Sequence, residues 1–222
     1  MPTVKVNDKY FSTQNERMAY LLGFFAADGN VSKKDNRIQS QLSIKDKSHL
    51  EKIQQEIGGC EVYEYLSGGY RSCGWHCFSA RIKQDLATYG IVPHKTGKIR
   101  IPQELNKIYW KDFIRGYFDG DGSIYKDGSG FRVSFTSANK EILEDINAFF
   151  SENGIKPSTL YPDHANVCIK FRSQASIDIY NLLYYPDCFC LDRKKEKYLQ
   201  VMKEKYGSTR LRNFPKEVEE IC

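Results

Sequence analysis

The sequence lacks the features of a membrane or secreted protein. No apolar run reaches the roughly 18 residues that a membrane-spanning helix needs, and the first residues, from Met1 to Asp8, form no apolar leader segment. The seven cysteines are an odd number, which argues against a framework of paired disulfides. We therefore expect a soluble intracellular protein with free thiols, from the cytoplasm of a microbe or phage host or from an organelle.

Three common kinds of site are missing as well. The sequence Ser67-Gly68-Gly69 indicates a hairpin turn rather than a nucleotide-binding loop, and no Ser-His-Asp arrangement is indicated. One cluster of possible zinc ligands has no common zinc spacing and no equivalent later in the chain: Cys60, Cys73, His76 and Cys77. We interpret these thiols as buried or bystander groups.

The composition is that of a folded, mildly basic protein. With 222 residues the chain can hold one large domain or two small ones. An apolar content of 41% and an aromatic content of 14% suffice for a packed core. The formal net charge of +5 fits a nucleic-acid partner, but alone it is weak support, because many ordinary proteins are slightly basic.

One short pattern occurs twice, at residues 21–29 and 114–122. Each copy is an apolar helical stretch that ends in Asp-Gly, and the two final acids, Asp28 and Asp121, are 93 positions apart. The same offset relates Leu50 to Leu143, so the repeat extends beyond the motif. We infer a duplicated unit with residues 1–105 as the first half, 106–202 as the second, and 203–222 as a basic C-terminal tail.

Hydrophobic periodicity predicts the order α-β-β-α-β-β-α in each half. In the first half, Thr13 and Glu16 form a possible capping box for the motif helix, and Gly29 suits a left-handed helix end. The other elements expected there are a strand at 37–44, a helix at 46–57, a hairpin of 61–66 with 74–80, and a helix at 81–89. The second half should contain helices at 112–121, 139–153 and 176–185, two strands within 123–137 that turn at 127–130, and a hairpin of 156–161 with 166–172.

Small residues recur four positions apart within both motif helices: Gly23 and Ala27, and Gly116 and Gly120. Residues with this spacing share one helix face, and small faces let two helix backbones approach closely. If these faces meet, the two final acids lie together at one end of the helix pair.

Such a pair of acids would break two local rules. A carboxylate at a helix C-terminus faces the negative end of the helix dipole, and neighbouring carboxylates repel each other. Rules broken symmetrically indicate a functional site. A hard divalent cation such as Mg²⁺ would relieve both costs, activate water and stabilise the leaving oxygen of a phosphodiester. The plain alternative is that Asp-Gly only ends each helix.

On these two motifs and the element order around them, roughly residues 12–200, the chain resembles the LAGLIDADG homing endonucleases of the monomeric, two-motif type. The resemblance implies an α+β fold of pseudo-twofold halves, with two antiparallel saddle-shaped sheets that grip DNA and the motif helices as a central interface. It assigns catalytic metal binding to the last acid of each motif, Asp28 and Asp121. Two or three divalent ions would be shared there, with the preceding Ala27 and Gly120 at the same site.

The motif copies differ at their sixth position, where Ala26 stands in the first and Asp119 in the second. The metal-binding acid of the family is at the eighth position, so the site should survive this difference. We expect Asp119 to be an accessory group or an ordinary helix residue rather than a metal ligand, because only one half supplies it.

Further catalytic candidates lie outside the motifs. The family often supplies a lysine beyond the last helix of each half, and Lys95 and Lys194 fit that position, with ordinary surface lysines as the alternative. A polar strand residue near the motif could position water. Gln39 or Gln41 would serve in the first half, with Gln41 our candidate, and Arg132 or Ser134 would be the counterpart in the second.

The outward faces of the strands are the expected DNA-reading surface, because Arg suits guanine and Gln suits adenine in the major groove. Some of these residues will be bystanders on a solvated sheet face. The candidates are Arg37, Gln39, Gln41, Ser43, Tyr63, Tyr65, Trp75, Arg132, Ser134, Thr136, Lys170 and Arg172.

The sequence thus predicts a monomeric, Mg²⁺-dependent endonuclease that cuts both strands of double-stranded DNA at a long, nearly asymmetric site, without an obligate protein or membrane partner. An RNA maturase or a non-cleaving DNA-binding regulator on the same fold is the alternative. A duplicated structural protein is a third, and it would show no salt-dependent DNA binding.

Overall fold

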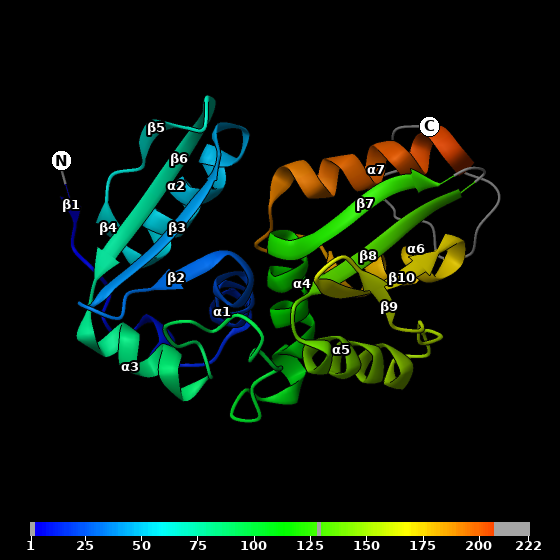
Figure 1. Cartoon of the computed structure of the whole chain (residues 1–222), viewed down its shortest axis with the longest axis horizontal. Helices are drawn as coiled ribbons and strands as arrows, with labels where there is room; N and C mark the ends of the chain where they lie inside the picture. The colour runs from blue at the N-terminus through cyan, green and yellow to red at the C-terminus, as the bar shows by residue number, and fades with distance from the viewer. Residues whose placement is uncertain (1–2, 128–129, 207–222) are drawn as a thin grey trace.

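The computed structural model describes residues 3–127 and 130–206, which form two similar halves (Figure 1). The first half contains α1 (Glu16–Asp28), β2 (Gly29–Val31), β3 (Arg37–Ser43), α2 (Lys47–Ile57), β5 (Tyr63–Ser67), β6 (Tyr70–Phe78) and α3 (Ala80–Thr88), together with the short strands β1 (Thr3–Val4) and β4 (Gly59–Cys60). The second half contains α4 (Trp110–Asp121), β7 (Gly122–Asp127), β8 (Gly130–Ser137), α5 (Lys140–Glu152), β9 (Tyr161–Asp163), β10 (Asn166–Arg172), α6 (Ser173–Leu183) and α7 (Asp192–Tyr206). Short 3₁₀ helices lie at Tyr10–Ser12, Ile44–Asp46 and Lys107–Tyr109.

Each half is built on one antiparallel four-stranded sheet, with strand orders β2-β3-β6-β5 and β7-β8-β10-β9. Helix α2 packs against β3 and β6, and α5 and α6 pack against β8 and β10. Side chains alternate across a strand, so Phe131, Val133 and Phe135 of β8 are buried on the helix side. The predicted α+β class and the α-β-β-α-β-β-α order of both halves are confirmed. Among the described residues, no helix combines the length and apolarity needed to cross a membrane.

Helices α1 and α4 pack side by side between the two sheets (Figure 1). Their backbones touch at two glycines. A Cβ atom on Gly23 would lie 1.9 Å from the Phe113 carbonyl oxygen, and one on Gly116 would lie 1.9 Å from the Tyr20 carbonyl oxygen. Only glycine fits at such a distance, so the small residues of the motif fix how closely the two halves approach.

The ends of α1 differ from the sequence-based expectation. The helix begins at Glu16 with Asn15 as its cap, and Asn15 Oδ1 accepts a 2.9 Å hydrogen bond from Met18 N. Thr13, the expected cap, has an extended backbone and lies two residues before Asn15. Gly29 is also extended, with φ −81°, rather than left-handed. It must be glycine for another reason: a Cβ there would lie 2.6 Å from the Phe25 Cα. The chain therefore passes directly from helix into strand.

Two further expectations in the second half are corrected. Strand β9 begins at Tyr161 instead of residue 156, because residues 156–160 form a loop that Ser158 ties to β10 through its Oγ, which bonds Lys170 N and O. Helix α7 was not predicted, and it takes in residues 203–206 of the expected tail. Residues 207–222 and part of the expected turn at 127–130 lie outside the described residues.

Candidate active site between the two halves

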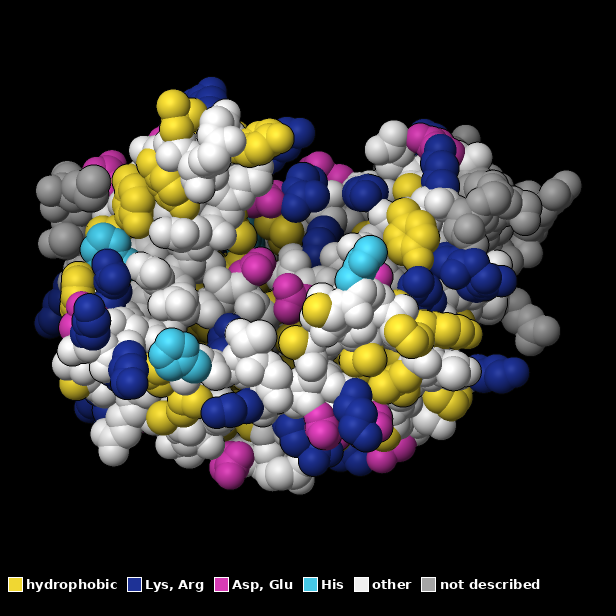
Figure 2. Space-filling view, in the orientation of Figure 1, with side chains coloured by type: hydrophobic (Ala, Val, Ile, Leu, Met, Phe, Trp, Pro, Cys, Tyr) yellow, Lys and Arg dark blue, Asp and Glu magenta, His cyan; other side chains and the backbone are white. Residues whose placement is uncertain are grey.

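Asp28 and Asp121 are the last residues of α1 and α4, and the close packing of these helices brings the two acids to the same end. A Cβ on Gly120 would lie 2.3 Å from the Ala27 Cβ and 3.4 Å from Asp28 Oδ2. The carboxylate of Asp28 therefore lies beside the residue that precedes Asp121. Figure 2 shows that the surface is hollowed between the two lobes, with acidic side chains near its centre and Lys and Arg side chains around them.

Both acids carry raised pKa values. Burial raises the pKa of Asp28 to about 6, and the neighbouring charge of Asp121 adds to this effect. The Asp121 side chain reaches solvent on one side, but the protein on its other side removes water and raises its pKa as well. The nearby ammonium groups of Lys194 and Lys95 act in the opposite direction on both acids. The two carboxylates thus retain an electrostatic cost that a cation would relieve.

The two candidate lysines contact the backbone at the ends of the motif helices. Lys194 Nζ donates to the carbonyls of Phe118, Gly122 (2.7 Å) and Gly120 (3.3 Å). Lys95 Nζ donates to the carbonyl of Ala27 at 3.3 Å. Burial lowers the pKa of both lysines, that of Lys194 to about 8. Each lysine therefore neutralises the negative end of one motif helix.

The donor chemistry of this site fits a hard divalent cation. Two carboxylates offer the oxygen ligands that Mg²⁺ prefers, and Mg²⁺ commonly keeps several waters beside one or two protein carboxylates. In the described part of the chain, no group of three or more His, Cys, Asp or Glu side chains is placed to hold a metal. The remaining ligands would have to be water and substrate oxygens. The carbonyls of Ala27 and Gly120, which we expected at the metal site, each accept a lysine hydrogen bond.

The raised pKa of Asp28 predicts a pH-dependent stability. An acid whose pKa rises from 3.8 in the unfolded chain to about 6 in the fold destabilises the fold by an amount that grows as the pH rises from the unfolded to the folded pKa and is fully present above the folded pKa. At pH 8 in the presence of a chelator, Asp28→Asn should raise the free energy of unfolding by about 2 kcal/mol. At pH 4 most of the gain should vanish. Urea unfolding at both pH values measures this, with Asp178→Asn on the outer helix α6 as control. An equal effect of Asp28→Asn at both pH values would contradict the burial of its charge.

Strand register decides which polar side chains adjoin the acids. Gly29 pairs with Ser40, and Gly122 pairs with Phe135. One step beyond these pairs, Gln41 comes opposite Asp28 and Thr136 comes opposite Asp121. Ser134, the expected counterpart of Gln41, is two residues away and buried. The segment from Asp121 to its partner in β8 is two residues longer than the segment from Asp28 to its partner in β3. A constant sequence offset of 93 therefore matches Gln41 to the wrong residue.

The open face of the first sheet is rich in aromatic and amide groups. Gln39 lies opposite His76, and the ring of Tyr63 lies over Gly74, where a Cβ would come within 2.7 Å of it. Tyr65 and Phe78 continue this face, with ring centroids 5.9 Å from Tyr63 and 5.5 Å from His76, respectively. His76 and Phe78 were missed as surface candidates, although they alternate with the buried Cys77 and so could have been found from the strand period.

Trp75, which we expected to read DNA, does not lie on the open face of the sheet. Its side chain is fully buried, stacks on Phe25 and donates from Nε1 to the Gly58 carbonyl at 2.9 Å. Trp75 is therefore a core residue of the first half. Along β3, Gln41 and Ser43 are exposed, whereas Arg37 and Gln39 are half-buried.

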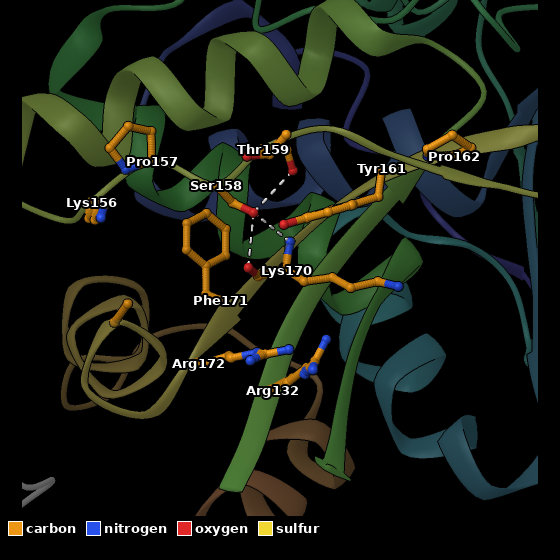
Figure 3. A pocket seen from close by; sticks show the side chains of 11 residues that line it. Arg132, Lys156, Pro157, Ser158, Thr159, Tyr161, Pro162, Lys170, Phe171 and Arg172 are labelled. Atoms are coloured by element: carbon orange, nitrogen blue, oxygen red, sulfur yellow. Dashed lines mark hydrogen bonds between the residues drawn. The ribbon is translucent and has the colours of Figure 1, made fainter. Parts of the chain in front are cut away.

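The open face of the second sheet is cationic instead. Arg132 of β8 and Arg172 of β10 are directly paired, and with Lys170 they line a cavity of about 790 Å³ (Figure 3). The loop before β9 closes the cavity with Lys156, and Tyr161 completes its wall. Thr136, on the same face, is half-buried. The two sheets thus present chemically different surfaces.

Sequence comparison identifies the domain type. A sequence model of the LAGLIDADG-like domain matches residues 15–59 and 111–170, one segment in each half. The replication factor C small subunit of Methanocaldococcus jannaschii is 28% identical over 138 residues, which are 61% of this chain and 7% of that protein. The chain spans between 7% and 61% of the length of the curated relatives that it matches.

Solved structures share the fold at low sequence identity. The LAGLIDADG homing endonuclease I-GzeII in complex with its DNA target is 15% identical, with a TM-score of 0.54 and coverage of 94% of this chain and 97% of that one. Full-length DUF199/WhiA from Thermatoga maritima is 12% identical, with a TM-score of 0.57 and coverage of 95% and 81%. The chain therefore contains a LAGLIDADG-like domain, whose two matched segments each hold one copy of the motif.

Proposed function

We propose that the chain is a site-specific, Mg²⁺-dependent DNA endonuclease that hydrolyses one phosphodiester in each strand. The observation that carries this proposal is the pair of carboxylates, Asp28 and Asp121, held at adjoining helix ends with raised pKa values. A structural role for these acids would favour low pKa values, whereas burial leaves both pKa values raised despite the nearby lysines.

The residues of the site divide the chemistry among them. Asp28 and Asp121 would hold two or three shared divalent ions, which when bound would polarise the phosphodiester and activate water. Lys194 and Lys95 keep the ends of α4 and α1 in place and stabilise negative charge that develops on the attacked phosphate. Gln41, opposite Asp28 in the register, would orient the attacking water.

The two open sheet faces support recognition of a long asymmetric DNA site. The first presents amide and aromatic groups, suited to adenine edges and stacking, and the second presents Arg132, Lys170 and Arg172, suited to guanine edges and phosphates. Because one chain carries both faces, a monomer would suffice. Cutting such a rare site would serve the homing of a mobile element, and an intron location of the gene would place the target at the joined exon junction.

A protein that binds nucleic acid without cutting it, an RNA maturase or a DNA-binding regulator, is the second candidate. Two observations favour it: the fold is shared with WhiA as well as with named endonucleases, and lysines occupy the Ala27 and Gly120 carbonyls. The intact pair of acids favours the nuclease.

Incubating the chain with a plasmid library of random inserts tests the proposal and yields its target. We expect linear plasmids with Mg²⁺ and none with a chelator, and sequencing of the cut ends should give one long motif without twofold symmetry. Binding without cutting would support the second candidate, whereas the absence of salt-dependent binding to both DNA and RNA would exclude both.

Mg²⁺ alone should also stabilise the protein, because it binds the folded site and not the unfolded chain. At 100 times its dissociation constant the gain should be about 2.7 kcal/mol, or roughly 5–10 °C in melting temperature. Thermal unfolding in Mg²⁺ and in a chelator measures this. The gain should be absent in a variant with both Asp28→Asn and Asp121→Asn, and its persistence there would place the ion elsewhere.

A further inference from the structure

Residues 191–194, which are the residue before α7 and the first three residues of that helix, form a segment that we term the clasp. Lys194 inserts its ammonium among the carbonyls around Asp121. Leu191 is the residue before α7, and its carbonyl accepts hydrogen bonds from Lys194 N at 3.0 Å and Lys195 N at 3.3 Å in the first turn. The position of Leu191 therefore sets the position of Lys194.

The two residues between them bind the first half of the protein. Arg193 donates two hydrogen bonds, of 2.6 and 2.7 Å, to the buried carboxylate of Asp46, and Lys52 contacts Asp192 at 2.6 Å. The exposed Lys52–Asp192 pair contributes little free energy. The forked Arg193–Asp46 pair is the geometrically specific contact, so the clasp touches both halves.

Asp119 holds the clasp at its first residue. Its carboxylate is buried on α4 and accepts hydrogen bonds from Leu191 N (2.7 Å), Tyr20 OH (2.8 Å) and Tyr184 OH (2.5 Å). These donors come from the clasp, from α1 of the other half, and from the segment after α6. Three donors to one buried carboxylate hold it in a single position. Asp119 lies two residues before Asp121 on the same helix.

The first half is built differently at the equivalent point. Ala26 occupies the position of Asp119, and its methyl side chain can accept no hydrogen bond. Lys95, the counterpart of Lys194, lies half-buried in a loop and contacts the Ala27 carbonyl at 3.3 Å. Lys194 contacts three carbonyls and is 7% exposed.

We propose that Asp119 is a positioning residue of the second half: by binding Leu191 it fixes the start of α7 and thereby holds Lys194 beside Asp121. The acid at the sixth motif position then acts in the second half only. The lysine that serves one DNA strand is consequently held more rigidly than the lysine that serves the other. This strand asymmetry rests on the proposed nuclease function, whereas the placement of Lys194 does not.

Amine labelling of the metal-free full chain tests the placement directly. The labelling rate of Lys194 relative to that of Lys95 should rise about tenfold in Asp119→Asn, because a lost hydrogen bond to a charged group opens the clasp by that order. Asp178→Asn is the matched control: it makes the same change of charge on α6 of the same half, where the side chain bonds Gln174 and lies outside the clasp. Should Asp119→Asn fail to fold, Tyr184→Phe removes one donor to the same carboxylate and should raise the ratio to a smaller extent.

Strand-labelled DNA supplies the second readout. Asp119→Asn should slow cleavage of one strand about tenfold more than that of the other, while Asp178→Asn should leave the strand ratio unchanged. An unchanged Lys194 to Lys95 labelling ratio in folded Asp119→Asn, or equal slowing of both strands, would overturn the proposal. If the wild-type chain cuts no DNA, the proposed function fails while the labelling ratio still decides the role of Asp119.

Discussion

Asp28→Asn and Asp121→Asn should each reduce double-strand cleavage by roughly a thousandfold or more and leave DNA binding intact. Several kcal/mol of transition-state stabilisation from a bound cation correspond to about three powers of ten in rate, and asparagine offers a far weaker ligand than a carboxylate. Binding depends on the sheet faces and on backbone contacts, which neither change touches. Gel-shift titration beside cleavage of the selected target separates the two effects.

The matched control for charge is Asp178→Asn, since every such change raises the net charge by one and strengthens nonspecific DNA binding equally. Asp178 lies on α6, bonds Gln174 and lines a surface depression beside the end of α5. The control should cut at the wild-type rate. Full cutting by the Asp28→Asn, Asp121→Asn double variant would refute the assignment of catalysis to this pair. A loss of binding in both single variants would instead show that the acids hold the fold together.

The sequence predicted those features that depend on local chemistry repeated twice. The two Asp-Gly ends and the small residues within each motif sufficed to predict a helix pair with two acids at one end, and Gly23 and Gly116 indeed stand against the facing backbone. Strand alternation predicted the buried face of β8. These inferences needed only the periods of helix and strand.

What the sequence did not predict depends on contacts between distant segments. The hydrogen-bond partners of Asp119 lie up to 99 residues away along the chain. The sequence around Asp119 alone therefore gives no sign of what this buried acid binds. The hydrogen-bond partner of the Trp75 indole, a carbonyl after α2, is likewise remote on the chain, although the strand period alone places Trp75 on the buried face with Cys73 and Cys77. The counterpart of Gln41 was misassigned because two extra hairpin residues shift the register, and such a shift leaves no mark on the motif spacing.

The two halves therefore differ in more than the sixth residue of the motif. The first half combines an amide-rich and aromatic sheet face with a lysine on a loop, whereas the second combines a cationic face with a lysine clamped by α7. Duplication supplied two equivalent acids. The groups around the acids then diverged, as expected if each half faces a different DNA half-site.

Gly116→Ala should destabilise the protein by about 3 kcal/mol and lower its melting temperature by roughly 10 °C. Helix propensity alone predicts the opposite, because alanine is better than glycine within a helix by about 1 kcal/mol. Packing must win here, since the new Cβ would lie 1.9 Å from the Tyr20 carbonyl oxygen, 2.7 Å from Phe24 N, and thus inside the backbone of the facing helix. Gly23→Ala should behave alike against Phe113, and denaturant unfolding measures both.

Gly97→Ala provides the control, because it tests backbone conformation without packing. Gly97 has φ +76° and open space around its Cβ direction, so alanine there should cost only about 1 kcal/mol of left-handed strain. The Gly116 variant should also lose cleavage ahead of global unfolding, since forcing α1 and α4 apart separates Asp28 from Asp121. A Gly116→Ala protein as stable as the wild type, or more so, would show that the helices do not meet at this glycine, and the shared site at their ends would lose its structural basis.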